Sequence, residues 1–251
     1  MRPMSDLVEV RRAGDVSILT LRRPEKLNAI STAMERALGS ALDHDTVRSS
    51  RALVLSGEGR AFSAGADVTE FQDRDVAAIL AYYRDTGAVY ERFARLPIPT
   101  FAAIHGYCLG GALELALAAD FRVADETAVF GLPEVSLGIL PSSGGTHQLV
   151  RLLGTARAKE LALLRERLDA AEALRVGLVT EVVAEGGALD RAVELATRLA
   201  ELPPLAVSLT KEAIDALGES SREAALLVER IGYAALAQTD EARAALDGFG
   251  K

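Results

Sequence analysis

Cysteine is almost absent from this sequence. The 251 residues include one cysteine, Cys108, so no disulfide can form within the chain. A secreted scaffold held together by disulfides is therefore excluded.

Basic residues are outnumbered as well. Lys and Arg total 28 against 36 Asp and Glu, a formal charge of −8. Binding to nucleic acid or to an anionic membrane surface needs clustered basic side chains, and this balance argues against both partners. Any anionic ligand must be met by a local basic patch or by backbone N–H groups.

Long hydrophobic runs are missing too. The N-terminal stretch "MRPMSDLVEVRRAG" has neither the apolar core nor the cleavage site of a signal peptide. The apolar stretch 107–119 is interrupted by Glu114 and is too short to span a bilayer. With 49% hydrophobic and 25% charged residues, the composition is that of an ordinary globular protein. We expect a cytoplasmic enzyme or binding protein.

Strand and helix patterns alternate along most of the chain. Apolar residues alternate or cluster as in strands, or recur at helical spacing, and a polar helix is expected over about 75–95. After the prolines at 203 and 204 the sequence becomes a helical tail rich in Ala and Leu. The pattern predicts an α/β core over 1–200 and a helical segment over 201–251. The expected strands are in "DVSILTL", "RALVLSG", "TFAAIHG", "FRVADETAVFG" and "VGLVTEVVA".

Three short segments combine glycine, small apolar residues and a nearby carboxylate. They are "AFSAGAD" at 61–67, "GYCLGGALE" at 106–114 and "FGLPEVSLG" at 130–138. Glycine lets another group approach the main chain closely, and free N–H groups where a helix begins attract negative charge. Two such groups from separate loops would form an oxyanion hole. Either loop alone is better explained by a tight turn and close packing.

Two carboxylates stand out in these segments. Glu114 is the one charge in a stretch that otherwise looks buried, and Glu134 follows Pro133. Each has an ordinary explanation as an acid in the first turn of a helix. As a pair on two apolar segments they can divide acid and base work.

Other site chemistries have little support. The three histidines, His44, His105 and His147, lack metal-ligand spacing, so no metal site is expected. The sequence contains neither a complete dinucleotide or P-loop fingerprint nor the nucleophile elbow of serine hydrolases.

Taken together and in order, the segments resemble the enoyl-CoA hydratase/isomerase (crotonase) family. The resemblance covers nearly the whole chain through "RRPEKLNAI", "GRAFSAGADV", "IHGYCLGGALELALAADFRVA", "FGLPEVSLGILPSSGGTHQLVRLLG" and "AEALRVGLVTEVV". It implies an α/β fold, a spiral of β-β-α repeats, with a C-terminal helical region for oligomerisation into homotrimers or homohexamers.

The resemblance also implies a site. The N–H groups of Ala64 and Gly111 would form the oxyanion hole, and Glu114 and Glu134 would be catalytic. The substrate would be an acyl-CoA thioester, with coenzyme A part of the substrate and no separate cofactor. Basic residues after the first strand, Arg22, Arg23 and Lys26, would meet the adenine end of CoA. The implied substrate-binding residues are Ala64, Gly65, Ala66, Asp67, Gly110, Gly111 and Lys26.

The chain departs from the family pattern at two places. It has Ala112 and Leu113 where many relatives have Gly and Cys, and "SSGGTHQ" at 142–148 where many have G-A-G-G-T-Q-R. The first change narrows the space beside the oxyanion hole, and the second reshapes the acyl end. Both bear on which acyl group is preferred, and neither removes a catalytic group.

Several functions remain compatible with this pattern. The leading interpretation is a 2-enoyl-CoA hydratase, because hydration uses both acids. A Δ3,Δ2-enoyl-CoA isomerase needs one acid. Dehalogenation, decarboxylation and C–C cleavage use the same oxyanion hole, so the fold alone does not choose. A non-catalytic acyl-CoA or RNA binder is the alternative from another class, and the charge of −8 argues against RNA.

Overall fold

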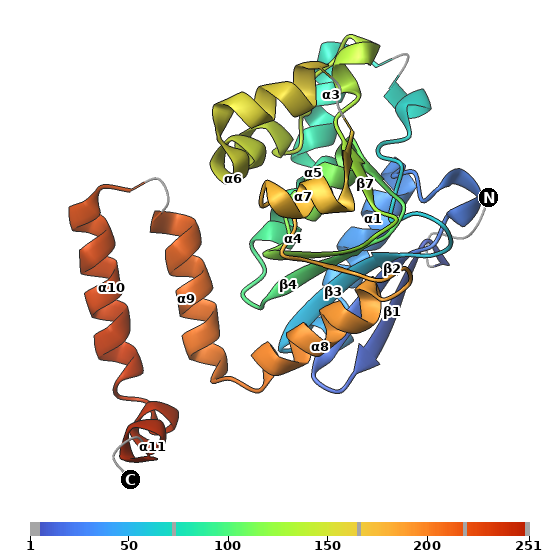
Figure 1. Cartoon of the computed structure of the whole chain (residues 1–251). Coiled ribbons are helices and arrows are strands. Elements are labelled where there is room, and N and C mark those ends of the chain that lie inside the picture. The colour runs from blue at the N-terminus through green and yellow to red at the C-terminus, as the bar shows by residue number, and fades with distance from the viewer. Residues whose placement is uncertain (1–5, 72–73, 165–166, 218–219, 249–251) are drawn as a thin grey trace.

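The protein is built around two β-sheets (Figure 1). The computed structural model describes residues 6–71, 74–164, 167–217 and 220–248. The large sheet has the order β1-β2-β3-β4-β6-β9, and every neighbouring pair in it is parallel except β1 and β2. Its strands are β1 (Val8–Ala13), β2 (Val16–Leu21), β3 (Ala52–Gly57), β4 (Thr100–Ile104), β6 (Phe121–Asp125) and β9 (Glu181–Val183). The small sheet has the order β5-β7-β8, with β5 (Tyr107–Leu109), β7 (Val129–Gly131) and β8 (Leu168–Asp169).

Successive turns of the chain form a spiral of β-β-α units. In one unit β4 lies in the large sheet, β5 lies in the small sheet, and α5 (Gly111–Leu117) follows. The next unit repeats this order with β6, β7, the 3-10 helix η5 (Glu134–Leu137) and α6 (Gly145–Lys159). After β3, Ser63 forms a parallel bridge to Cys108, so the preceding turn approaches the small sheet in the same way. The expected β-β-α spiral is confirmed.

Helix α8 (Ala188–Ala200) covers one face of the large sheet. Its buried residues, spaced four apart, are all alanines and pack against residues such as Val54 and Phe101. Residues four apart share one face of a helix, and a face of methyl groups lets the helix backbone come close to the sheet. These alanines are Ala188, Ala192, Ala196 and Ala200.

The opposite face carries the larger core. Side chains from α1 (Thr32–Leu42), α4 (Val89–Ala94) and α5 meet there with residues of both sheets. All seven residues of α5 are buried. The remaining helices are α2 (Asp45–Arg48), α3 (Val76–Arg84), α7 (Ala170–Arg175), the short 3-10 helices η2 (Pro24–Lys26), η3 (Val68–Phe71) and η4 (Thr86–Ala88), and the π-helix η6 (Glu160–Leu164).

The structure differs from the expected secondary structure at three places. Strand β1, which pairs antiparallel with β2, was not among the expected strands. The single polar helix expected over about 75–95 is instead α3, η4 and α4, and α4 buries Val89, Tyr90 and Phe93. At the break, a Cβ on Gly87 would lie 3.1 Å from the Tyr83 ring, so packing against the preceding turn fixes the bend. The late strand is limited to β9.

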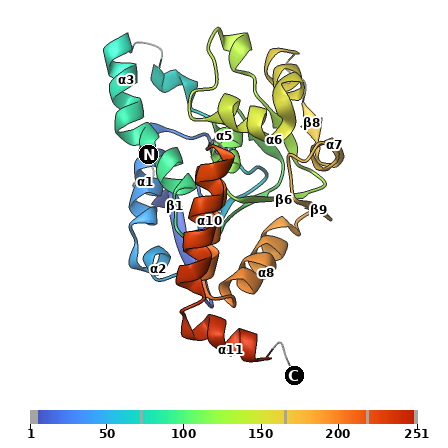
Figure 2. The same ribbon diagram turned by 90° about the vertical axis from the view of Figure 1, so that its left-hand side faces the viewer.

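The tail consists of α9 (Pro204–Leu217), α10 (Arg222–Leu236) and α11 (Asp240–Gly248), which stand apart from the body in Figure 1. Seen from the tail side, α10 lies in front of the body and α11 below it (Figure 2). Lys211 on α9 is anchored to the body, because its Nζ donates to Asp120 Oδ2 at 2.8 Å and to the Ile98 carbonyl at 3.1 Å. The division at residue 200 stays a prediction.

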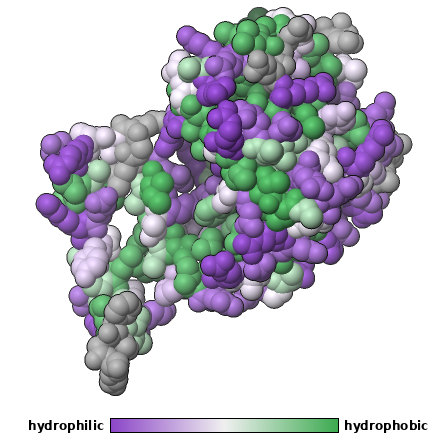
Figure 3. All heavy atoms as spheres, viewed as in Figure 1, coloured by the Kyte–Doolittle hydropathy of each residue, from purple (hydrophilic) through white to green (hydrophobic). Residues whose placement is uncertain are grey.

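Large apolar side chains are exposed on the tail, and hydrophobic surface is visible there in Figure 3. Within the described ranges, none of the helices combines the length and hydropathy needed to cross a membrane. The exposed apolar residues of the tail are Leu205, Ile214, Leu227, Val228, Ile231, Tyr233 and Leu246.

Candidate active site

The site is built around the N-terminus of α5. Gly110 precedes the helix with φ 53° and ψ −129°, a conformation that favours glycine. At the other end, the buried guanidinium of Arg122 donates to the Ala119 carbonyl at 2.8 Å and to the Leu178 carbonyl at 2.7 Å. A cation at the C-terminal end of a helix complements its dipole. This contact fixes the C-terminal end of α5 in the core, and its first residue, Gly111, lies beside Ala66 of the 61–67 loop.

Asn28 shapes that loop, a role the sequence interpretation missed. It is fully buried, has φ 53°, and its Nδ2 donates to the carbonyls of Glu58 and Ala61, both at 2.8 Å. Its own carbonyl accepts a 2.7 Å hydrogen bond from Ser63 Oγ. One amide side chain therefore holds several turns of backbone that would otherwise have unpaired polar groups. The available signal was an Asn within "RRPEKLNAI", a residue type that tolerates positive φ.

Gly65 brings the loop against the strand that leads into α5. Its φ is 102°, and a Cβ there would lie 2.6 Å from the Leu109 carbonyl oxygen, so no larger residue fits. The consequence is that Ala66 lies beside Gly111. The Ala66 nitrogen is 3.5 Å from the point where a Cβ on Gly111 would be.

The structure does not leave both N–H groups of the predicted oxyanion pair free. The Ala64 N–H donates to the Leu27 carbonyl at 2.9 Å and is occupied by the fold. In the part of the chain that the structure describes, the N–H groups of Ala66 and Gly111 have no protein acceptor. Ala66, and not Ala64, is therefore the loop residue whose unoccupied N–H lies beside Gly111. The sequence shows the loop, but neighbouring N–H groups point in different directions, and only the folded backbone determines which one is free.

Glu114 is held by backbone amides. Its side chain is in a residue only 4% exposed, and Oε1 accepts hydrogen bonds from the N–H groups of Ser143 at 2.7 Å and Gly145 at 2.9 Å. Burial raises the pKa of Glu114, and the hydrogen bonds from Gly145, Ser143 and Ser142 oppose that rise. These donors favour the ionised carboxylate, the form that a base requires.

Glu134 has the contrasting environment. The residue is 8% exposed, and its Oε2 has no hydrogen-bond partner among the described residues. Its Oε1 lies 2.8 Å from where a Cβ on Gly110 would be, which places it at the start of α5. Burial, with a smaller contribution from the charge of Glu114, raises the pKa of Glu134 from 4.5 to about 7. A carboxyl group poised near neutral pH is suited to donate a proton.

Two free amides and two buried carboxyl groups thus meet at one helix N-terminus. A family model for enoyl-CoA hydratase/isomerase matches residues 11–250. The chain belongs to the enoyl-CoA hydratase/isomerase family.

Relatives match the chain over almost its full length. It is 37% identical to the 2,3-dehydroadipyl-CoA hydratase of Escherichia coli, covering 98% of this chain and 96% of that protein. It is 34% identical to the short-chain-enoyl-CoA hydratase of Clostridium acetobutylicum, with 96% and 94% covered. Among solved structures, the enoyl-CoA hydratase of Thermoplasma volcanium superposes with a TM-score of 0.91 at 34% identity, with 98% of both chains covered. The crotonase fold is therefore established.

The remaining site residues predicted from the family have varied surroundings. Asp67 accepts from Thr69 Oγ1 at 2.7 Å and from Arg23 Nη1 at 2.8 Å, contacts that lower its pKa and hold the loop together. Arg22 donates to Glu58 at 3.0 Å. Lys26 is exposed and forms no ion pair with another described residue. Of the three basic residues expected to meet CoA, only Lys26 has no ion-pair partner among the described residues, whereas Arg22 and Arg23 bind carboxylates of the protein.

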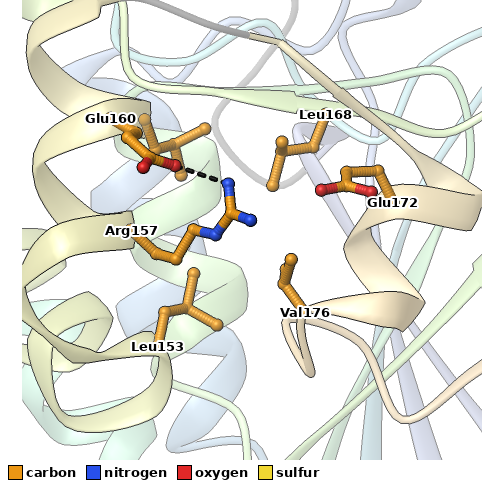
Figure 4. Close-up of a pocket in the computed structure, with 7 residues that line it drawn as sticks. Leu153, Arg157, Glu160, Leu168, Glu172 and Val176 are labelled. Atoms are coloured by element: carbon orange, nitrogen blue, oxygen red, sulfur yellow. Dashed lines mark hydrogen bonds and ion pairs between the residues drawn. The ribbon is translucent and has the colours of Figure 1, made fainter.

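A separate small hollow lies between α6 and α7 (Figure 4). Arg157 and Glu160 form an ion pair at 2.5 Å on its α6 side, and Glu172 on its α7 side accepts from Arg175 Nε at 2.6 Å. Each charged side chain that lines the hollow has an ion-pair partner, and none of the lining residues belongs to the predicted site.

Proposed function

We propose that this protein adds water across the 2,3 double bond of a 2-enoyl-CoA thioester to give a 3-hydroxyacyl-CoA. The observation that carries the proposal is the contrast between Glu114, held by two backbone N–H donors, and Glu134. One oxygen of Glu134 has no partner among the described residues, and its pKa is raised to about 7. Carboxyl groups whose environments push their proton affinities apart are suited to base and acid roles at one centre.

The mechanism follows from these groups. The thioester carbonyl oxygen accepts hydrogen bonds from the N–H groups of Ala66 and Gly111. Glu114 takes a proton from water as the water oxygen bonds to C3, and the π electrons of the double bond move to form an enolate. Glu134 then gives its proton to C2, and the enolate returns to the thioester. A lost oxyanion donor typically costs about 10²–10³ in rate, so the amides matter as much as the acids.

Isomerisation is the second candidate within the family. Moving a double bond from C3 to C2 shifts one proton between C4 and C2, and Glu134 alone could carry it. The position of Glu114, fixed by the amides of Ser143 and Gly145, favours hydration, because a separately held base is needed to activate water.

The proposal also covers the binding of coenzyme A, the acyl group, the oligomeric state and the location of the protein. Coenzyme A would enter as part of the substrate, with Lys26 near its adenine end and no separate cofactor. The relatives from Escherichia coli and Clostridium acetobutylicum carry names with different acyl groups, so no acyl chain is assigned. The exposed apolar side chains of the tail support a homotrimer or homohexamer. A cytoplasmic location stays a prediction.

The decisive experiment follows turnover of a panel of 2-enoyl-CoA thioesters of increasing chain length. Hydration is read from loss of the absorbance of the double bond conjugated with the thioester, and from a product heavier by one water in mass spectrometry. The same protein is given a 3-enoyl-CoA. Formation of 3-hydroxyacyl-CoA supports the proposal. Conversion of the 3-enoyl substrate with no hydration of any 2-enoyl substrate would establish the isomerase.

A further inference from the structure

Tyr90 lies at the oxyanion hole without having been singled out by the sequence. It is on α4, the residue is 4% exposed, and its ring belongs to the larger core. Its hydroxyl oxygen is 3.3 Å from the point where a Cβ on Gly111 would be, and the Ala66 nitrogen is 3.5 Å from the same point. The Tyr90 hydroxyl and the Ala66 amide therefore both lie beside Gly111, which carries the second free amide.

The hydroxyl of Tyr90 has no protein partner in the described part of the chain. Its neighbours differ: the Tyr82 hydroxyl donates to Glu35 Oε1, and the Tyr83 hydroxyl pairs with Ser142 Oγ. A buried tyrosine hydroxyl normally finds a hydrogen-bond partner. The Tyr90 oxygen is not among the fully buried polar atoms that lack a partner, so it is not completely enclosed by the protein.

We propose that the Tyr90 hydroxyl is a third hydrogen-bond donor to the thioester carbonyl oxygen, beside the N–H groups of Ala66 and Gly111. The inference rests on the proposed function, because it needs a thioester in that position. Packing of the ring in the core holds the donor before substrate arrives, which is the condition for electrostatic stabilisation of a developing oxyanion.

The chemistry of the phenol fits this role. Burial, followed by the charge of Glu35, raises the pKa of Tyr90 well above its ordinary value. The hydroxyl therefore stays protonated and able to donate throughout the range in which the carboxyl groups titrate. A competing role is purely steric: the same hydroxyl would limit the size of a substituent at C2, without bonding to the carbonyl oxygen.

The test compares two ligands that differ in the carbonyl group. A saturated acyl-CoA thioester and the matching S-alkyl-CoA thioether are titrated against the wild-type protein, Tyr90→Phe and Tyr82→Phe. Tyr90→Phe keeps the ring and removes the donor, whereas Tyr82→Phe removes a buried hydroxyl that bonds to Glu35. Thermal melting of all three proteins reports on folding.

With a third donor, the preference for thioester over thioether falls about 10-fold in Tyr90→Phe, and kcat/KM for the 2-enoyl-CoA falls by about 10- to 100-fold. Tyr82→Phe lowers the melting temperature and keeps the wild-type preference. An unchanged preference in Tyr90→Phe overturns the proposal, and improved turnover of a 2-methyl-branched enoyl-CoA in that variant would assign the steric role instead. If the preference is unchanged in Tyr90→Phe while the wild-type protein still hydrates enoyl-CoA, only the inference about Tyr90 has failed and the proposed function stands. A wild-type protein that binds neither ligand overturns the proposed function with it.

Discussion

Gly145 lies directly against Glu114. Its N–H donates a 2.9 Å hydrogen bond to Glu114 Oε1, and a Cβ on Gly145 would be 2.7 Å from Glu114 Cγ. The same residue therefore supplies a hydrogen bond to the carboxylate and leaves the space that the carboxylate needs. Because the contact is with a buried side chain in the first turn of α5, there is little room for adjustment.

The first prediction changes this glycine. Gly145→Ala is expected to push Glu114 away from its position, lowering kcat for a 2-enoyl-CoA at least about 10-fold and costing about 1–3 kcal/mol of stability through overpacking. Gly232→Ala on α10 is the control, since a Cβ there meets no atom of the described residues within 4 Å. Steady-state kinetics and urea unfolding measure both effects. Wild-type kcat in Gly145→Ala would contradict the proposed role of this contact.

The sequence predicted the parts of the fold that depend on local pattern. The alternating strands, the helix that begins at Gly111 and the three glycine-rich segments are visible because hydrophobic period and glycine placement are local signals. The break between α3 and α4 was missed, because it depends on how Gly87 packs against Tyr83, a contact that no period reveals. Strand β1 was missed because it is an edge strand with exposed residues.

For the site, the sequence identified the segments that contribute to it, and did not determine which backbone N–H groups and side chains face one another. Glu114 and Glu134 lie at the same helix N-terminus, as expected from their segments. The choice between Ala64 and Ala66 depends on which N–H the Leu27 carbonyl occupies, a long-range backbone contact. Tyr90 was missed for a similar reason, because its link to Gly111 is made in space across about twenty residues of chain.

A second prediction separates the roles of the two acids. Glu114→Gln and Glu134→Gln keep the size of the side chain and remove its proton transfer, so each is expected to lower kcat for a 2-enoyl-CoA by about 10²–10⁴. Any isomerase activity on a 3-enoyl-CoA should fall far more in Glu134→Gln than in Glu114→Gln. Circular dichroism checks that both variants are folded. If Glu114→Gln hydrates at the wild-type rate, the two-acid mechanism fails.

The third prediction concerns stability and pH. The pKa of Glu134 is raised from 4.5 to about 7, so the folded protein binds this proton more tightly than the unfolded chain. The resulting stabilisation is fully present below about pH 4.5 and is lost as the pH rises through about 7. Glu134→Gln removes this dependence, and should gain stability relative to wild type by up to about 2–3 kcal/mol between pH 4.5 and pH 8.

Urea unfolding of both proteins at the two pH values measures that gain. The difference between wild type and variant isolates Glu134, because Glu35, whose pKa burial also raises to about 7, titrates in both proteins. A difference that is the same at both pH values would mean that Glu134 titrates normally.

The fourth prediction concerns the anionic end of CoA. Lys26 is exposed and free of ion pairs with described residues, whereas Arg23 is bound to Asp67 at 2.8 Å. Lys26→Ala should therefore raise KM for a CoA thioester several-fold with kcat nearly unchanged, and the effect should shrink as salt increases. Arg23→Ala should act mainly on stability, by releasing the loop. An unchanged KM in Lys26→Ala at every salt concentration removes this residue from the CoA site.

The last prediction concerns the tail. Leu227 and Ile231 on α10 are 58% and 62% exposed, and residues four apart lie on one face of a helix. Apolar side chains on one face of an exposed helix favour burial against another copy of the chain. Light scattering at micromolar protein is expected to give the mass of a trimer or hexamer.

Charged substitutions on this face of α10 test directly whether the face forms the contact between chains. Leu227→Glu combined with Ile231→Glu should reduce the mass toward that of one chain, because charges buried in an apolar interface would be unpaired. Glu229→Gln, on the same helix, should keep the wild-type mass. A wild-type protein that is already monomeric rules out this assembly, and an unchanged mass in the double variant places the contact elsewhere. The two outcomes differ because the first concerns association itself and the second concerns which face of α10 makes it.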